Sequence, residues 1–159
     1  MFNSRRGWIL LLTGLILAAD CALPEHPRAV ASFPPPPASS SSAPAGTIIL
    51  PRAHSHNDYT RKRPLYDALD QGFCSVEADI HLVNGALLVA HNADQCRPDR
   101  TLESMYLAPL REQVHHNGGR VYPGYTSRFI LLIDFKTADE ATLEALLTLL
   151  ESYRDMLTV

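Results

Sequence analysis

The chain has 159 residues, a formal net charge of −3 and 46% hydrophobic residues. This length is sufficient for one small globular core. The slight negative charge, together with the lack of a basic patch containing aromatic residues, argues against a nucleic-acid partner.

Residues 1–21 have the pattern of an export signal. Two arginines precede an apolar run at 8–19, which is too short to predict a membrane span. The cleavage position stays open. The segment ending at Cys21 is similar to a lipoprotein signal but has an aspartate where a small residue is expected, and cleavage nearby or after Ala31 is the alternative. We therefore expect an exported protein, either secreted, periplasmic or membrane-anchored through a lipid on Cys21.

Residues 22–46 form a linker that is almost wholly Pro, Ser and Ala from residue 32 onward. Such a composition cannot bury enough apolar surface to order itself, so the segment is expected to be a semi-extended tether. The globular part is then 47–159. It is far shorter than the roughly 250 residues of a complete eight-stranded α/β barrel.

Strand and helix signals alternate through 47–159. They predict strands at 48–54, 73–79 and 129–133, a hairpin of 80–83 with 86–89, and helices at 64–72, within 101–116 and after 137. Asn84-Gly85 is the turn signal of the hairpin. The run at 129–133 predicts a strand buried on both faces, and Thr137 with Glu140 predicts a capping box. The order βαβαβα predicts an α/β fold with a parallel sheet.

Polar residues interrupt these apolar strands at three separated places. They are His54-Ser55-His56-Asn57, then Glu77-Ala78-Asp79 followed after the hairpin by His91, and then Asp134-Phe135-Lys136. Parallel α/β barrels collect their catalytic groups where strands end. Carboxylates at alternate strand positions point the same way and can share a divalent cation such as Mg²⁺ or Ca²⁺. Two histidines nearby can divide the base and acid roles of a phosphodiester cleavage.

The segment from Ala53 to Lys136 resembles the phospholipase C-like phosphodiesterase superfamily. This superfamily includes glycerophosphodiester phosphodiesterases, phosphoinositide phospholipases C and spider-venom sphingomyelinase D. The group related to yeast altered inheritance of mitochondria protein 6 is the most similar. The resemblance implies that 47–159 is the N-terminal portion of a (β/α)8 TIM barrel, truncated in this chain.

The resemblance also implies roles for single residues. The phospholipase C pattern implies that His56 is catalytic and Asn57 binds the metal, whereas the sphingomyelinase pattern would select His54. His91 matches the second catalytic histidine. The implied metal ligands are Glu77, Asp79 and Asp134, and Lys136 is placed to meet the substrate phosphate.

The function that follows is metal-dependent hydrolysis of a phosphodiester or a phospholipid-derived substrate. Two alternatives remain. His54-x-His56 also resembles the metal pair of a zinc-dependent amidohydrolase, although the further histidines and aspartate of that pattern are absent. The other alternative is a non-catalytic exported barrel fragment.

Five further residues have expectations of their own. His81 is expected on the surface, because it lies farther along the hairpin than Asp79. His115 and His116 are expected to end a helix. Asp58 and Tyr59 are expected to structure the loop after the first strand, with direct substrate contact as the alternative.

Overall fold

The computed structural model describes residues 47–137 and 139–158. The predicted export signal at 1–21 and the predicted linker at 22–46 lie outside the described residues. In the described part of the chain, no helix has both the length and the apolar character needed to cross a membrane.

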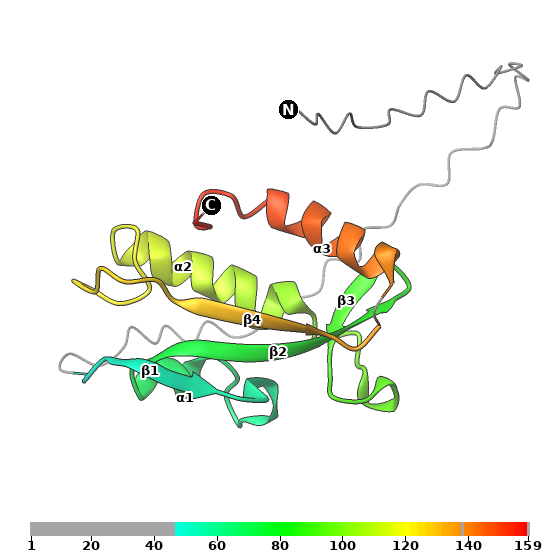
Figure 1. Cartoon of the computed structure of the whole chain (residues 1–159), viewed down its shortest axis with the longest axis horizontal. Helices are drawn as coiled ribbons and strands as arrows, with labels where there is room; N and C mark the ends of the chain where they lie inside the picture. Colours follow the sequence, from blue (N-terminus) through cyan, green and yellow to red (C-terminus); the bar gives the residue numbers. More distant parts are fainter. Residues whose placement is uncertain (1–46, 138, 159) are drawn as a thin grey trace, which may run out of the picture. The chain divides into compact units, whose positions relative to one another are not determined.

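A four-stranded sheet forms the centre of the fold (Figure 1). Its long central strand is β2 (Phe73–Val83). This strand is parallel to β1 (Leu50–Ser55) on one edge and to β4 (Ile130–Phe135) on the other. The second half of β2 is antiparallel to β3 (Ala86–Val89), which confirms the predicted hairpin. The protein is therefore a mixed α/β structure whose sheet is mainly parallel.

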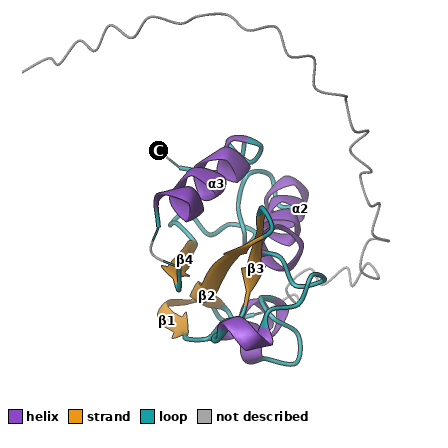
Figure 2. Ribbon diagram, turned by 90° about the vertical axis from the view of Figure 1, so that its right-hand side faces the viewer, coloured by secondary structure: helices purple, strands orange, loops and turns teal. Residues whose placement is uncertain are grey.

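Helices connect the parallel strands. α1 (Tyr66–Asp70) lies between β1 and β2, and α3 (Glu140–Glu151) follows β4. α2 (Ala108–His116) continues a π-helical segment, Glu103–Leu107, and precedes β4. Figure 2 shows α2 and α3 on one side of the strands. Residues of all three helices join one face of β2 and β4 in a single hydrophobic core.

α1 is shorter than the helix predicted for 64–72. It begins after Leu65, whose φ of 65° is not helical. Gly72 closes the turn after it with φ of 77°, and a Cβ at this position would lie 2.1 Å from the carbonyl oxygen of Ile48. Only glycine therefore permits this close approach of the turn to the segment that leads into β1.

The two faces of β2 have different chemistry, because successive side chains of a strand point to opposite faces. The face toward the helices is apolar and buried, and carries Cys74, Val76, Ala78 and Ile80. The opposite face carries Ser75, Glu77, Asp79 and His81. The polar residues of the sequence motif thus share the face that turns away from the core.

β4 is not buried on both faces, so that prediction is wrong. Leu131, Ile133 and Phe135 pack against the core. Ile130 and Leu132 point to the other face and are 55% and 47% exposed. An apolar run predicts that a strand is buried, but it does not say what covers each face. In the described residues, helices cover one face of β4 and no second layer covers the other.

The start of α3 also differs from the prediction. Its N-cap is Asp139, whose carboxylate accepts hydrogen bonds from the backbone N–H of Thr142 at 2.7 Å and from the Thr142 hydroxyl at 2.6 Å. The Thr137 hydroxyl instead accepts a hydrogen bond from the backbone N–H of Leu82 at 3.3 Å. The predicted Thr137–Glu140 capping box is wrong because Thr137 ties the chain after β4 to β2.

Candidate active site

Three carboxylates converge on the polar face of the sheet. β2 contributes Glu77 and Asp79, and the parallel register pairs Asp79 with Asp134 of β4. One carboxylate oxygen from each residue lies within 4.8 Å of the others. Glu77 and Asp79 are buried, whereas Asp134 is partly exposed. Among the described residues this is the one set of three acidic, histidine or cysteine side chains with metal-binding proximity.

Asp79 lies at the centre of the group. Its Oδ2 lies 2.7 Å from the Tyr59 hydroxyl, 3.0 Å from Nδ1 of His91 and 2.9 Å from Nζ of Lys136. Burial alone would raise the pKa of Asp79, but the hydrogen bonds from these three donors outweigh it and leave that pKa below its usual value. Asp79 is therefore an ionised, buried carboxylate.

The surroundings of the other oxygen of Asp79, Oδ1, show whether a metal ion would fit this site. Oδ1 is buried and has no hydrogen-bond partner among the described residues, although such a group normally has one. Protein donors contact Oε2 of Glu77 and Oδ2 of Asp134. An oxygen-only ligand set of three carboxylates suits a hard divalent cation. The residues present thus fit a metal ion, and Oδ1 of Asp79 is a buried oxygen that no donor of the described residues occupies.

Lys136 lies beside the carboxylates. Its Nζ is 2.7 Å from Oδ2 of Asp134 and 2.9 Å from Oδ2 of Asp79. Hydrogen bonds to Asp134 and Asp79 raise the pKa of the lysine. Since an ammonium group has three N–H donors, one of them remains for a further acceptor such as a phosphate oxygen.

Two of the three predicted catalytic histidines contact the carboxylates. His91 follows the hairpin, where the backbone N–H of Ala90 donates to the carbonyl of Asp79 at 3.2 Å and Nδ1 of His91 lies 3.0 Å from the Asp79 carboxylate. Nε2 of His56 lies 3.3 Å from Oε2 of Glu77. Both rings are largely exposed, which leaves them accessible to a substrate.

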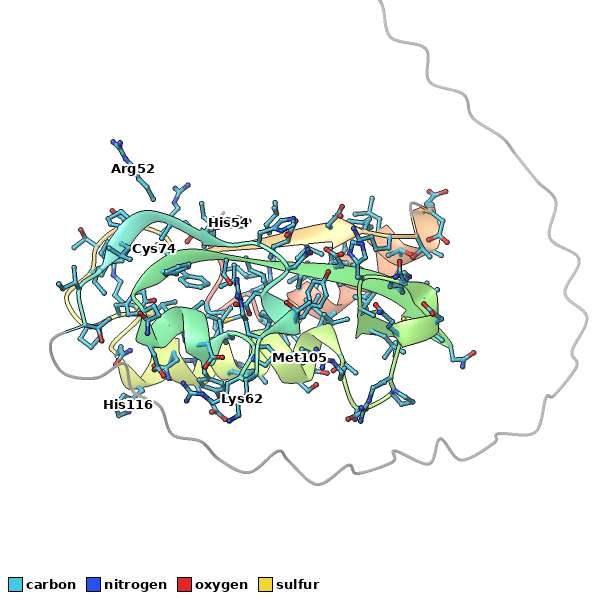
Figure 3. The ribbon with its side chains drawn as sticks, turned by 90° about the horizontal axis from the view of Figure 1, so that it is seen from below. Arg52, His54, Lys62, Cys74, Met105 and His116 are labelled. Carbon is cyan, nitrogen blue, oxygen red and sulfur yellow. The ribbon has the colours of Figure 1, made fainter. Side chains whose placement is uncertain are left out.

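His54 has a different neighbour. Its Nδ1 lies 2.8 Å from Oγ of Ser75, the residue with which it is paired across β1 and β2. Figure 3 shows His54 on β1, far from His116 at the end of α2. No set of three potential ligands in the described residues includes His54 or His56, so the zinc alternative gains no support.

Asn57 and Tyr59 connect the loop after β1 to the carboxylates. Asn57 adopts a left-handed conformation, with φ of 50°, which asparagine tolerates better than most residues. Its backbone N–H donates to Oε2 of Glu77 at 2.9 Å, and its Oδ1 lies 2.8 Å from the Tyr59 hydroxyl. Burial and the Asp79 carboxylate raise the pKa of Tyr59, so its hydroxyl stays protonated.

Sequence reasoning undervalued Tyr59. Tyr59 was expected mainly to structure the loop. In the structure its hydroxyl contacts Asp79 and lies 3.3 Å from Nδ1 of His91. The neighbouring Asp58 has the structuring role alone. It is buried and accepts hydrogen bonds from the Ser55 hydroxyl at 2.8 Å and the Tyr106 hydroxyl at 3.0 Å.

His81 is buried, so the prediction that it is exposed is wrong. It is 5% exposed, and its Nε2 has no hydrogen-bond partner in the described part of the chain. The chain that follows β4 runs beside this part of β2, since the backbone N–H of Lys136 donates to the carbonyl of Ile80 at 3.0 Å. His115 and His116 lie in the last turn of α2, as expected.

Residues 45–158 match the family model of the AIM6-like phosphodiesterase domain. The chain belongs to this family. Proteins named Altered inheritance of mitochondria protein 6 are similar to it in sequence. The relative from Lachancea thermotolerans is 39% identical over 112 residues, which cover 62% of this chain and 26% of the relative. The relative from Kluyveromyces lactis is 36% identical over 126 residues, which cover 63% of this chain and 30% of the relative.

The Saccharomyces cerevisiae relative of the same name is 34% identical over 98 residues, covering 54% of this chain and 25% of the relative. This AIM6-like chain thus spans less than a third of the length of the curated relatives it matches. No solved structure matches it.

Proposed function

We propose that this AIM6-like phosphodiesterase domain is a metal-dependent hydrolase of glycerophosphodiesters or phospholipid head groups. The observation that carries the proposal is the environment of Asp79. This buried carboxylate has one oxygen bound to Tyr59, His91 and Lys136 and another without a partner, within a group of three carboxylates. The sheet would be the first part of a (β/α)8 barrel, with the carboxylates on its inner face.

Each residue has a role in this proposal. Glu77, Asp79 and Asp134 would hold a Mg²⁺ or Ca²⁺ ion, with Asn57 beside them, and the ion would offset the negative charge of the phosphate. Lys136 keeps one N–H for a phosphoryl oxygen. These groups bind and orient the phosphodiester before any bond changes.

The two histidines would move the protons. An ionised Asp79 only accepts hydrogen bonds, so its contact with Nδ1 of His91 requires the proton to be on that nitrogen. In the neutral imidazole, Nε2 of His91 is then the nitrogen without a proton, and it would accept one from water or from a hydroxyl of the substrate, which attacks phosphorus. The bond from phosphorus to the leaving alcohol breaks, and His56 protonates that alcohol.

The test is hydrolysis of a glycerophosphodiester by the full chain, with and without a chelator. Activity should vanish in chelator and return with Mg²⁺ or Ca²⁺, and Glu77→Gln or Asp79→Asn should remove most of it. Glu144→Gln is the matched control, because Glu144 is an exposed carboxylate of α3. Full activity in chelator would contradict the metal requirement.

One observation favours a second candidate, a non-catalytic exported protein. The face that carries the carboxylates also exposes Ile130 and Leu132, so the described residues leave the β4 part of this face open to water. A chain that binds the cation by calorimetry but releases no alcohol from any phosphodiester would support this second function.

A further inference from the structure

A cavity of about 480 Å³ begins at the candidate active site and extends away from the carboxylates. Tyr59 and His91 form its wall toward the site. Gln95, Arg97 and Arg100, from the segment that follows the hairpin, also line the cavity. Its volume is within the range of small-molecule pockets. His91 therefore has the carboxylates on one side and this cavity on the other.

The charge of the cavity is positive. Two arginines line it, and no carboxylate is among the described residues that do so. Arg97 donates through Nε and Nη2 to the two oxygens of Asp99, both at 3.0 Å, which leaves Nη1 for another acceptor. Asp99 thus orients the guanidinium and offsets part of its positive potential.

Arg100 gives the cavity a fixed wall. Its Nη2 donates to the backbone carbonyl of Tyr59, and its own carbonyl accepts a hydrogen bond from the backbone N–H of Val89 at 2.8 Å. The first bond connects the segment after the hairpin to the loop after β1, and the second connects it to the end of β3. The cavity between them is held open by the fold before a ligand arrives, which lowers the ordering cost of binding.

We propose that this cavity binds a phosphate monoester carried by one alcohol of the phosphodiester substrate. The inference rests on the proposed function, because a phosphodiester held at the carboxylates would extend one of its two alcohols past His91. Arginine matches phosphate through parallel charge-assisted hydrogen bonds. The cavity therefore favours a head group with a second negative charge over a neutral or quaternary ammonium head group.

The first arm of the test measures binding without catalysis. Glycerophosphoinositol 4-phosphate and glycerophosphoinositol differ by a single phosphate monoester, and calorimetry with the full chain in chelator gives both dissociation constants. We expect the phosphorylated probe to bind about tenfold more tightly, as one charge-assisted contact provides. Equal dissociation constants would overturn the proposal.

The second arm uses charge variants on the cavity wall. Arg97→Gln should abolish the preference, and Asp99→Asn should increase it because it releases the guanidinium of Arg97. Arg111→Gln is the matched control, since Arg111 pairs with Asp155 outside the cavity. A preference that survives Arg97→Gln would also overturn the proposal.

Hydrolysis of glycerophosphoinositol, which lacks the second phosphate, separates this inference from the proposed function. A binding preference without turnover of either compound would retain the cavity assignment and remove the phosphodiesterase. Turnover of both compounds without a binding preference would retain the phosphodiesterase and remove the cavity assignment.

Discussion

The Tyr59 hydroxyl lies 2.7 Å from Oδ2 of Asp79. The same hydroxyl is 2.8 Å from Oδ1 of Asn57 and 3.3 Å from Nδ1 of His91. One hydroxyl therefore contacts the loop after β1, the central strand and the residue after the hairpin. Since it has one proton, it donates either to Asp79 or to Asn57 at a time, and Nδ1 of His91 carries a proton of its own. Its position fixes the distance between the loop and the imidazole.

Tyr59→Phe tests this positioning role. The ring is retained and only the hydroxyl is lost, so we expect kcat/KM for phosphodiester hydrolysis to fall by roughly ten- to a hundredfold and its pH profile to shift, because Asp79 loses a donor. Tyr106→Phe is the control, since it removes a buried hydrogen bond to Asp58 outside the site. Both variants should lose about 1–2 kcal/mol of stability. An unchanged pH profile in Tyr59→Phe would leave the hydroxyl with a structural role only.

The histidines should differ in importance. His91→Ala and His56→Ala remove groups that contact the carboxylates, and we expect each to lower kcat by a factor of roughly 10²–10⁴. His54→Ala should have a smaller effect, because His54 contacts Ser75. Steady-state kinetics of the three variants checks this order. A larger loss for His54 than for His56 would transfer the catalytic role to His54.

Lys136 should oppose metal binding while it supports catalysis. Its ammonium group contacts the carboxylates of Asp79 and Asp134, so it competes with a divalent ion for negative charge. Lys136→Met should therefore lower the dissociation constant for Mg²⁺ or Ca²⁺ by about threefold to tenfold, in calorimetry at low salt, and lower turnover. Weaker cation binding in the variant would refute the competition.

The cap of α3 predicts a pH dependence of stability. Hydrogen bonds from Thr142 lower the pKa of Asp139. A carboxylate with a lowered pKa stabilises the fold above its usual pKa of about 3.9, and this contribution is lost as the pH falls through the lowered value. Asparagine also caps helices, but it does not titrate and lacks the negative charge that the helix N-terminus favours.

The measurement compares Tm for the parent chain and Asp139→Asn between pH 7 and pH 3. The advantage of the parent chain over the variant should shrink toward pH 3. Asp139→Ala should lower Tm by a few degrees at pH 7, because it removes the cap at every pH. A difference between the parent chain and Asp139→Asn that is the same at both pH values would show that Asp139 does not titrate in this range.

The meeting of the carboxylates could be predicted from the sequence. Glu77 and Asp79 alternate on one strand, and Asp134 follows the apolar run of the next parallel strand, so the period of a strand and the parallel register determine their common face. Asp79 and Asp134 are distant in the chain, but the alternation of strands and helices predicted that their strands run parallel. The Asn84-Gly85 turn signal likewise placed His91 directly after the hairpin.

The remaining features depend on contacts between distant segments. The role of Tyr59 requires its loop to reach Asp79 of β2, and the burial of His81 depends on the tertiary packing around β2. The apolar run of β4 could not reveal that only one face is covered. In the same way, Thr137 and Asp139 are both good caps, and the contact of Thr137 with Leu82 decided between them.

The two-residue turn between β2 and β3 has a consequence for how this family can vary. Asn84 and Gly85 both have positive φ, 50° and 80°, and a Cβ at Gly85 would meet nothing within 4 Å. The turn therefore has room for other side chains, provided that they tolerate this conformation. One inserted residue between the turn and His91, however, would reverse the strand alternation and carry the imidazole to the opposite face. Natural homologues should vary here in residue type but keep a constant length, unless a bulge elsewhere in the hairpin restores the alternation.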